Sequence, residues 1–467
     1  MNNVRLYDTR AREVLSVTPA GEVLKIYACG PTVYRYAHVG NLRTFLLLDL
    51  ITRLAHLNGW KTNVIQNITD VGHLVDDTQI DAQGEDKILE QAKLEGKDPF
   101  AIARFYEEAF HKDLKALNVL PADVYPRASE SIQLIIDICQ KLEVAGHAYV
   151  GTDGSLFFDA KSFPTYGAIS GNSLDHLKPG HRLEDKGSEA KRFHADWALW
   201  KNAGTDRAMT WPSPWGNGFP GWHIECSAMS LEHLGESIDV HLGGIDLRFP
   251  HHEDERAQSD SVAGREVVQH WVHGEHLLFE GRKMSKSSGN VVLVSDLIAR
   301  GFDPLALRLS FLESRYRTQL DLSWAAIAAA HKTIARWRSQ LTTWRNPEGV
   351  MTPETSQARE QGLALLQEDL NSPALIQFLR KIEKDDALPL DQRAILFDYF
   401  DQFLGLDLTR LESRESSAEI NELLQQREDA RGRGEWKQSD QLREALAHLG
   451  VEVRDTATGQ AWEWRSQ

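Results

Sequence analysis

The chain has 467 residues, which at about 150 residues per domain is enough for roughly three domains with their own cores. Hydrophobic residues make up 42% and charged residues 26%, a balance typical of globular proteins and not of disordered or fibrous ones. With 52 Lys and Arg against 68 Asp and Glu the net charge is -16, so nucleic acid could bind only at local basic patches.

The sequence predicts neither a membrane span nor an export signal. The longest apolar stretch, residues 44–57, is interrupted by Asp49 and Arg53 and falls short of the roughly 20 apolar residues that cross a bilayer. The first residues lack an apolar segment followed by small residues, so we expect a cytoplasmic location. Three cysteines are too few for a disulfide framework, and metal binding or catalysis would better explain any functional role.

The first third of the chain predicts a parallel α/β sheet followed by helices. Residues 25–29 and 62–68 are predicted strands, and residues 42–57 predict an amphipathic helix between them, which together make a βαβ unit. Such sheets bind ligands at the carboxyl ends of their strands. Residues 99–117 and 129–145 then predict two helices.

A segment rich in Gly, Pro and Trp, residues 151–220, predicts an inserted module of short strands that interrupts the sheet. Sheet-like sequence returns over residues 238–242 and 272–279. After Asp303 the patterning is helical. A helical bundle is expected from residues 325–344, 356–370, 373–382 and 392–403.

The C-terminal part begins with a polar run over residues 412–417, which predicts a linker. Two helices are predicted over residues 419–434 and 435–449, before a small tail. Basic residues recur four apart on them, Arg427 with Arg431 and Arg433 with Lys437. They could form two basic stripes for RNA, although a solvated helix face is the more ordinary explanation.

The first chemical motif lies between the first strand and the first long helix, where residues 29–32 read CGPT and residues 37–41 read AHVGN. Free N–H groups at the helix N-terminus, together with the imidazole of His38, could hold a nucleotide phosphate. Gly40 would let that phosphate approach the backbone closely. An ordinary strand-to-helix turn with a surface histidine explains the same pattern about equally well.

The second motif is KMSKSSGN over residues 283–290, which contains Lys283 and Lys286 and has no apolar periodicity. Such a cationic loop could close over a polyphosphate and supply ammonium charge as pyrophosphate leaves. A solvated charged loop is the usual explanation of such a string. Its occurrence together with the first motif favours phosphate binding.

A possible metal site combines residues from distant parts of the chain. His251 and Glu255 are four apart and would project from one face of a helix, while the thiols of Cys29 and Cys226 would come from other elements. Sulfur, imidazole and carboxylate ligands together suit zinc. From spacing alone, buried cysteines and a solvated His and Glu cluster remain the more ordinary explanation. Cys139 lies in an apolar helix pattern and is predicted to be a core residue.

Together these motifs resemble those of the cysteinyl-tRNA synthetases, a family of class I aminoacyl-tRNA synthetases. Residues 38–41 resemble the HIGH signature of that class, and residues 283–287 reproduce its KMSKS signature. Further segments that match the family are residues 67–71, 196–201, 221–226, 243–247, 249–253, 303–308, 369–373 and 455–459. The resemblance therefore extends along the whole chain.

The resemblance implies an α/β fold class, in which a Rossmann-type parallel-sheet catalytic core is split by a connective insertion. A mostly α-helical C-terminal half and a small anticodon-binding module would follow. The implied division is residues 1–120, first half of the catalytic core; 121–220, connective insertion; 221–280, second half of the core; 281–324, KMSKS loop and stem-contact region; 325–411, helical bundle; and 412–467, anticodon-binding module.

The resemblance also implies a chemistry. The protein would activate L-cysteine with ATP and Mg²⁺ to cysteinyl-adenylate, then transfer the cysteinyl group to tRNA(Cys), acting as a monomer. One Zn²⁺ per chain would bind the substrate thiolate and reject serine, a near-isostere that an apolar pocket discriminates poorly. The implied residues are Cys29, Cys226, His251 and Glu255 for zinc; His38, Lys283 and Lys286 for catalysis; His38, Gly40, Asn41, Gly243, Asp246 and Lys286 for ATP; and Thr69 and Trp222 for the substrate cysteine.

Two other functions fit parts of the sequence. A ligase that joins cysteine to an amino-sugar would keep the zinc residues, but it would have no use for the tail over residues 425–464. A non-catalytic RNA-binding paralogue would not need His38, Lys283, Lys286 and four metal ligands. Both alternatives are therefore weaker than tRNA charging.

Overall fold

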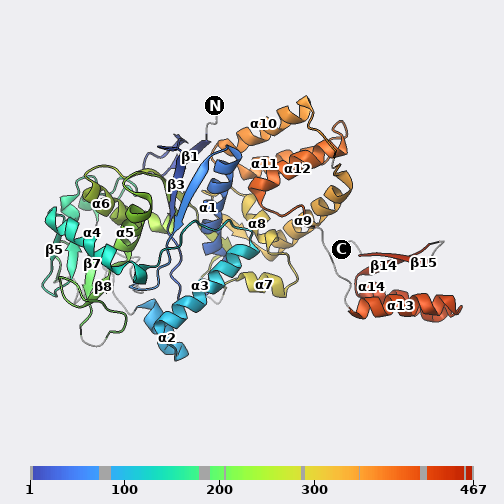
Figure 1. Ribbon diagram of the computed structural model, residues 1–467, viewed down its shortest axis with the longest axis horizontal. Coiled ribbons are helices and arrows are strands. Elements are labelled where there is room, and N and C mark those ends of the chain that lie inside the picture. Colours follow the sequence, from blue (N-terminus) through green and yellow to red (C-terminus); the bar gives the residue numbers. More distant parts are fainter. Residues whose placement is uncertain are drawn as a thin grey trace. The chain divides into compact units, whose positions relative to one another are not determined.

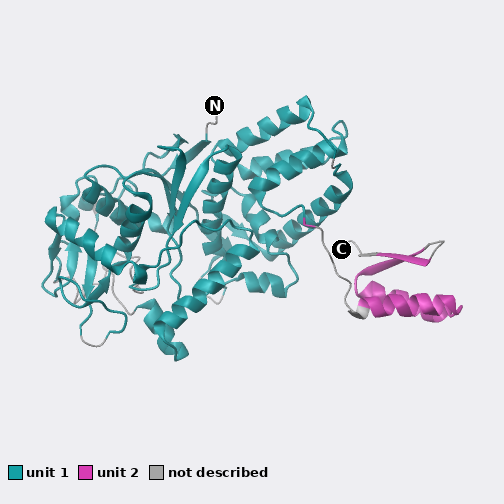
Figure 2. Ribbon diagram, in the orientation of Figure 1, with its two compact units in different colours: residues 1–409 teal, residues 410–467 magenta. Residues whose placement is uncertain are grey.

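The computed structural model describes residues 4–72, 86–177, 190–204, 207–284, 290–346, 348–410, 418–456 and 459–464. The chain forms two compact units, residues 1–409 and residues 410–467 (Figure 2). Within the described ranges, no helix combines the length and the apolar character needed to cross a membrane.

A four-stranded parallel sheet forms the centre of the first unit (Figure 1). In spatial order its strands are β10 (Val268–Gly274), β9 (Ile238–Gly244), β3 (Val23–Ala28) and β4 (Lys61–Gln66). Helix α1 (Val39–Leu57) joins β3 to β4, so the predicted βαβ unit is confirmed. Because β4 lies on one side of β3 and β9 on the other, the carboxyl ends of β3 and β9 flank a topological switch point, where such sheets bind ligands.

An N-terminal hairpin, which the sequence analysis did not predict, adjoins the edge strand β10. It pairs β1 (Val4–Asp8) with β2 (Glu13–Val17). The carboxylate of Asp8 accepts hydrogen bonds from the backbone N–H of Ala11 at 2.5 Å and of Trp271 at 2.8 Å. The N–H of Thr9 also donates to the carbonyl of Trp271, at 2.8 Å. The turn of the hairpin is therefore fixed to β10.

The inserted module follows helices α2 (Lys87–Glu95) and α3 (Pro99–Ala116), the turn η1 (Ala128–Glu130) and helix α4 (Ile132–Val144). Its short strands are confirmed as an antiparallel sheet of β5 (Ala148–Val150), β6 (Leu156–Phe158), β7 (Trp197–Asn202) and β8 (Gly218–Pro220). Short 3-10 turns η2 (Ala160–Ser162) and η3 (Leu174–His176) lie between β6 and β7. Stacked rings of Phe158 and Trp197, with centroids 4.4 Å apart, mark its core, and Cys139 is buried there as predicted.

Two helices return the chain from this module to the sheet. Helix α5 (Trp222–Leu234) precedes β9, and the 3-10 turn η5 (Ile245–Arg248) leads from β9 into helix α6 (His251–Ala263). Residues 251–260 of α6 read HHEDERAQSD, and all ten are buried. The sequence analysis placed only His251 and Glu255 on a helix, because such a segment has no apolar face from which its full length could be predicted.

The remaining described helices of the first unit are two short ones outside the predicted bundle and four that agree with it to within a few residues. They are α7 (Val294–Ala299), α8 (Leu305–Leu312), α9 (Trp324–Trp344), α10 (Pro353–Gln367), α11 (Ser372–Ile382) and α12 (Leu390–Leu404). A small sheet in the same unit consists, in spatial order, of β12 (Arg282–Lys283), β11 (Leu277–Phe279) and β13 (Leu320–Leu322). The buried Arg308 of α8 donates to Asp49 of α1 at 2.5 Å and to the carbonyl of Leu117 at 3.0 Å, which ties the bundle to the sheet.

The second unit packs α13 (Ala418–Gly432) and α14 (Trp436–His448) with a hairpin of β14 (Val451–Thr456) and β15 (Gly459–Trp464). Arg427 is fully buried and donates to Asp455 at 2.8 Å and to Gln460 at 2.7 Å. The interpretation of Arg427 as part of an exposed basic stripe is therefore wrong, because its guanidinium holds the hairpin to α13. The linker predicted over residues 412–417 lies outside the described residues.

Candidate metal centre and active site

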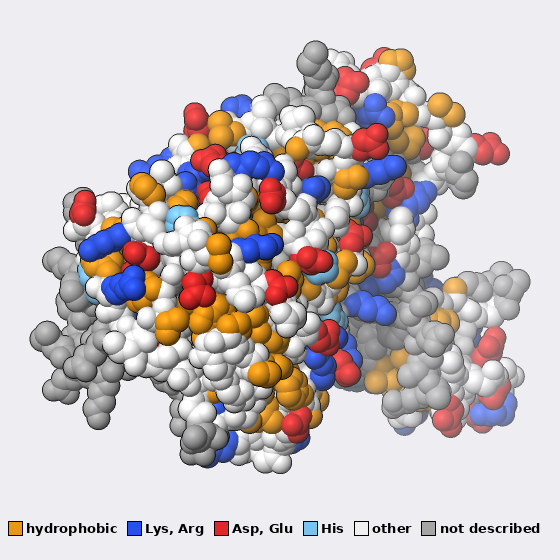
Figure 3. All heavy atoms as spheres, turned by 60° about the vertical axis from the view of Figure 1, so that its left-hand side comes forward, with side chains coloured by type: hydrophobic (Ala, Val, Ile, Leu, Met, Phe, Trp, Pro, Cys, Tyr) orange, Lys and Arg blue, Asp and Glu red, His pale blue; other side chains and the backbone are white. Residues whose placement is uncertain are grey.

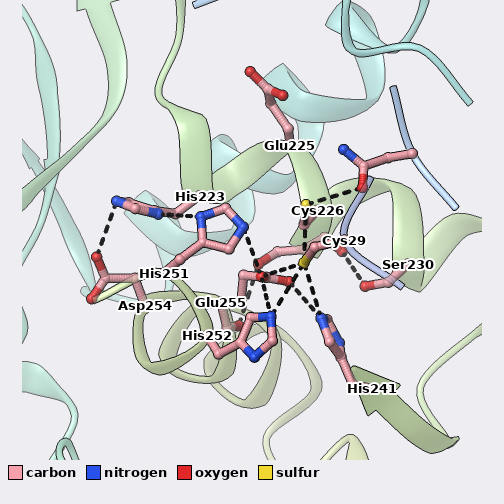
Figure 4. Close-up of polar contacts among 12 residues, drawn as sticks. Cys29, His223, Glu225, Cys226, Ser230, His241, His251, His252, Asp254 and Glu255 are labelled. Atoms are coloured by element: carbon pink, nitrogen blue, oxygen red, sulfur yellow. Dashed lines mark hydrogen bonds and ion pairs between the residues drawn. The ribbon is translucent and has the colours of Figure 1, made fainter. Parts of the chain in front are cut away.

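Four predicted metal ligands meet at the carboxyl edge of the sheet (Figure 4). Cys29 directly follows β3, Cys226 lies in α5, and His251 and Glu255 lie one turn apart on α6. One ligand atom from each of the four lies within 4.8 Å of the others. Glu255 Oε1 is 3.3 Å from Cys29 Sγ and 3.0 Å from His251 Nε2, and the two Sγ atoms are 3.8 Å apart. Three segments distant in sequence thus supply one buried donor set.

Burial gives this donor set unusual proton affinities. It raises the pKa of the Cys29 thiol well above its ordinary value, and the adjacent Cys226 and Glu255 act in the same direction. Burial also opposes charge on His251, but the neighbouring Glu255 carboxylate and the Cys226 sulfur outweigh it and raise the pKa of His251 to about 10. The cluster of two sulfurs and a carboxylate therefore stabilises a positive charge at its centre, as a site for a divalent cation would.

His223 fixes the orientation of the His251 ring from the side that faces away from the cluster. Its Nδ1 lies 2.7 Å from Nδ1 of His223, and Nε2 of His223 lies 3.4 Å from the carboxylate of Asp254 (Figure 4). The other ring nitrogen of His251 then faces the cluster. Metal-binding histidines are commonly held in this way through their second nitrogen.

A second group of histidines adjoins the same cluster, and the sequence analysis missed it. His241 and His252 form an alternative donor set with Cys29 and Glu255, also within 4.8 Å of one another. Nδ1 of His252 lies 2.8 Å from Nε2 of His273. Burial lowers the pKa of His241 to about 4 and that of His273 to about 3, so both rings are neutral. The sequence offered one signal for this group, since His241 and His273 each lie in a predicted strand of the sheet.

A cavity of about 250 Å³ opens beside the metal cluster. Cys29 belongs to both the cluster and the cavity wall, and Trp222 lines the cavity with its ring centroid 4.2 Å from that of His251. Thr69 is buried, and its hydroxyl donates to Glu225 at 3.0 Å. Of the two residues predicted to contact the substrate, Trp222 therefore faces the cavity, and Thr69 holds Glu225.

His38 and Asn41 form a capping box at the start of α1. Nδ1 of His38 accepts the N–H of Asn41, and the Asn41 side chain accepts the N–H of His38, both at 3.2 Å. Burial lowers the pKa of His38 to about 4, so the ring is neutral at pH 7. Because Nδ1 is an acceptor, the proton of the neutral ring is on Nε2. His38 therefore offers one N–H donor beside the free N–H groups of the helix.

The two signature motifs are adjacent in space. A Cβ atom placed on Gly40 would lie 2.8 Å from Cε of Met284, the residue after Lys283. The N–H of Val39 also donates to the carbonyl of Val292 at 2.9 Å. Residues on either side of 285–289 thus contact the start of α1. Lys283 is exposed, and Lys286 lies outside the described residues.

The predicted nucleotide-binding residues differ in their surroundings. Asn41 and Asp246 line the 250 Å³ cavity. Gly243 packs instead against α6, where an added Cβ would lie 2.8 Å from the ring of His252 and from Leu247. Close packing therefore accounts for the glycine at position 243.

Comparison with known proteins agrees with this arrangement. A family model described as the catalytic domain of class I (C) tRNA synthetases matches residues 16–332, and one for the cysteinyl-tRNA ligase anticodon-binding domain matches residues 413–465. A cysteine–tRNA ligase of Thermus thermophilus is 40% identical, with 98% of each chain covered. That of Chlorobaculum tepidum is 36% identical, with 99% of each chain covered.

A solved structure shows the same fold. The methionyl-tRNA synthetase of Mycobacterium tuberculosis, in complex with methionyl-adenylate, matches with a TM-score of 0.57 at 16% identity, over 86% of this chain and 94% of that one. The parallel sheet and the paired motifs at its carboxyl edge are those of a class I aminoacyl-tRNA synthetase. Within that class, the chain belongs to the cysteine–tRNA ligase family. The family and the fold class implied by the sequence motifs are confirmed, and the ligase prediction is confirmed at the level of the family.

Proposed function

We propose that this protein activates L-cysteine with ATP and Mg²⁺, transfers the cysteinyl group to tRNA(Cys), and selects cysteine through one Zn²⁺. The observation that carries the proposal is the double position of Cys29. It is a member of the buried donor set and also lines the cavity beside α1. An amino acid in that cavity would have its side chain next to the metal and its carboxyl group near the phosphate-binding motif.

The residues present fit zinc. Two thiols, one imidazole and one carboxylate make a four-ligand set of the kind that zinc prefers, and His223 orients the imidazole. A zinc ion bound there would supply a Lewis acid that binds a thiolate far better than a hydroxyl. Cys29, Cys226, His251 and Glu255 would hold it, and Trp222 would close the pocket over the substrate.

The chain's own residues would bind and polarise the phosphates. His38 would donate from Nε2 to the α-phosphate, alongside the N-terminal N–H groups of α1. A side chain at position 40 would collide with Met284 and the ring of His38, so Gly40 lets the two signature motifs pack closely, and Asn41 and Asp246 would contact the nucleotide. Lys283 and Lys286 would neutralise charge as pyrophosphate departs.

The C-terminal unit would bind the anticodon end of the tRNA while the chemistry stays in the first unit. The division into a split catalytic core, connective insertion, stem-contact region, helical bundle and anticodon module stays a proposal, as does the monomeric state. The family model that matches residues 413–465 supports the assignment of the anticodon module.

Substitution of one cysteine tests the zinc assignment. The parent protein should contain about one zinc per chain, and Cys226→Ser should lose both the metal and ATP–pyrophosphate exchange with cysteine. Metal analysis and the ratio of exchange with cysteine to exchange with serine are the measurements. Cys139→Ser is the matched control, because Cys139 is equally buried in the core of the inserted module and should retain zinc and selectivity. Full zinc content and unchanged selectivity in Cys226→Ser would refute the assignment.

A further inference from the structure

A second cavity, of about 280 Å³, lies at the carboxyl end of β10. Its polar lining is Thr9, Arg12, Arg248, His273, Glu275 and Arg317. Three of these six residues carry a guanidinium and one carries a carboxylate. The cavity therefore has a positive lining in a protein whose net charge is -16.

Two of the three arginines have no carboxylate partner among the residues that the structure describes. Nε of Arg248 is buried and makes no hydrogen bond within the described ranges. The exposed guanidinium of Arg12 likewise makes no ion pair with any described residue. Arg317 differs, since its Nε donates to Asp369 at 2.6 Å. The carboxylate of Glu275 accepts the N–H of His276 at 3.0 Å. Two guanidinium groups are therefore left to attract an anion.

The walls of this cavity are fixed. Arg12 has a φ of 62°, a left-handed conformation that costs a non-glycine residue energy, and its N–H is held by the carbonyl of Asp8 at 2.8 Å. The same turn is bound to β10 through Thr9, whose hydroxyl lies 2.7 Å from Nδ1 of His273. Ile169, which also lines the cavity, is held by Glu253, whose carboxylate accepts the N–H groups of Ile169 and Ser170 at 3.0 and 2.9 Å. Arg12 therefore projects from a preorganised turn.

The turn η5 separates the two cavities. Asp246 and Leu247 line the cavity beside Cys29, whereas Ile245 and Arg248 line the arginine cavity. An anion held by Arg248 would thus lie one turn of backbone away from the activated amino acid. A guanidinium matches a phosphate through its planar fork of N–H donors, and backbone phosphates position a nucleic acid on a protein.

We infer that the arginine cavity binds a backbone phosphate of the single-stranded 3′ end of tRNA and positions its terminal nucleotide at the neighbouring cavity, where the activated carboxyl group of the amino acid would lie. The inference rests on the proposed tRNA-charging function. Binding is electrostatic and shape-based, and Arg12 and Arg248 are positioning residues for the transfer step. Free pyrophosphate shares this chemistry, but it would affect cysteine activation as well as transfer.

The variants Arg12→Gly and Arg248→Gln distinguish binding of a tRNA phosphate from binding of free pyrophosphate. In each variant, single-turnover transfer from enzyme-bound cysteinyl-adenylate to tRNA should slow by about 10- to 100-fold, the effect of losing one charged hydrogen bond. ATP–pyrophosphate exchange, which needs no tRNA, should fall far less. The plot of log affinity for tRNA against log salt concentration should also become shallower by about 0.7 for each phosphate that the variant no longer binds.

Arg12→Gly also excludes a purely structural effect. Glycine adopts the left-handed conformation of residue 12 without strain, so the variant should unfold at an unchanged or higher temperature while transfer slows. Arg265→Gln is the control, because Arg265 is an exposed arginine of the same unit, 3.5 Å from the exposed Glu236, and should leave transfer unchanged. Unchanged transfer in both cavity variants would overturn the inference. Equal loss of exchange and transfer would also overturn it and would assign the cavity to free pyrophosphate.

Discussion

His38 can act in catalysis only through one nitrogen. Its Nδ1 is used by the cap of α1, so the substrate side of the ring presents Nε2–H. The pKa of about 4, lowered mainly by burial, keeps the ring neutral as the pH falls from 8 to about 5. The imidazole is therefore a hydrogen-bond donor and not a cation at physiological pH, and loss of activity between pH 7 and 6 would have to come from another group.

His38→Asn should separate capping from catalysis. Asparagine is a good N-cap residue, so the free energy of unfolding should change little, whereas His38→Ala should also lose about 1 kcal/mol through the cap. Both variants lack the Nε2–H donor, and ATP–pyrophosphate exchange should fall by about 100-fold or more in each. Exchange kinetics and urea unfolding are the measurements. Near-normal exchange by His38→Asn would show that the ring does not contact the phosphate.

The four candidate metal ligands were predicted as one set through the family resemblance, because spacing alone favoured ordinary buried cysteines and a solvated His and Glu cluster. His251 and Glu255 are four apart with two cysteines elsewhere, and the structure brings all four together. His241 and His273 were not found, because single histidines in strand-like sequence carry no spacing signal. Their contacts depend on which strands are neighbours, which only the tertiary fold determines.

At the scale of elements, α3 is anchored by a charge network centred on the buried Glu107. Its carboxylate accepts from Nε of Arg127 at 3.0 Å and from Arg104 at 2.8 Å. Burial would raise the pKa of Glu107, but hydrogen bonds from His111, Arg127 and Arg104 outweigh it and lower the pKa to about 2. The network therefore favours the charged carboxylate in the folded state.

The effect of Glu107→Gln on the free energy of unfolding should depend on pH. The pKa is depressed on folding, from about 4.3 in the unfolded chain, so the carboxylate stabilises the fold above about pH 4.3. That stabilisation is lost as the pH falls through the window from about 4.3 to about 2. The variant should thus be less stable than the parent at pH 7, and the difference should shrink at pH 3, as measured by urea unfolding. Glu108→Gln, at the exposed neighbouring position, is the control; a difference that does not change with pH would contradict the assignment.

Elements with a clear apolar period were predictable from the sequence, and elements without one were not. The four bundle helices α9 to α12 agree with prediction to within a few residues at their ends. Helix α6 has ten successive buried residues, of which nine are polar or charged, so its pattern indicates a surface segment. Its burial is explained by partners from other elements, which the local sequence does not contain.

The whole molecule combines an acidic net charge with a nucleic-acid substrate. On the face drawn in Figure 3, basic and acidic side chains are interspersed, and neither sign covers a continuous area. In the second unit Arg433 and Lys437 are exposed, as a local contact with tRNA would require. Arg427, which is buried, serves the fold of that unit instead.

Deletion of residues 416–467 should separate the two half-reactions. The first unit has its own core and contains the metal cluster and both cavities, so ATP–pyrophosphate exchange with cysteine should persist almost unchanged. Charging of tRNA should fall strongly because the segment matched by the anticodon-binding model is gone. Steady-state charging and exchange rates are compared in the same preparations. Equal loss of both rates would show that the tail supports the fold, and unchanged charging would exclude it from tRNA recognition.

The polar helix α6 limits how the inserted module can change in evolution. One side of α6 contributes His251 and Glu255 to the metal cluster, while Glu253, Asp254 and Arg256 bind residues 165–170 of the module. A module transplanted from a distant relative would remove the hydrogen bonds that residues 165–170 make with these three buried side chains, and losing a partner of a buried polar group is a costly defect. Chimeras between relatives should therefore fold only when α6 and the module come from the same parent, so the two have to be inherited together.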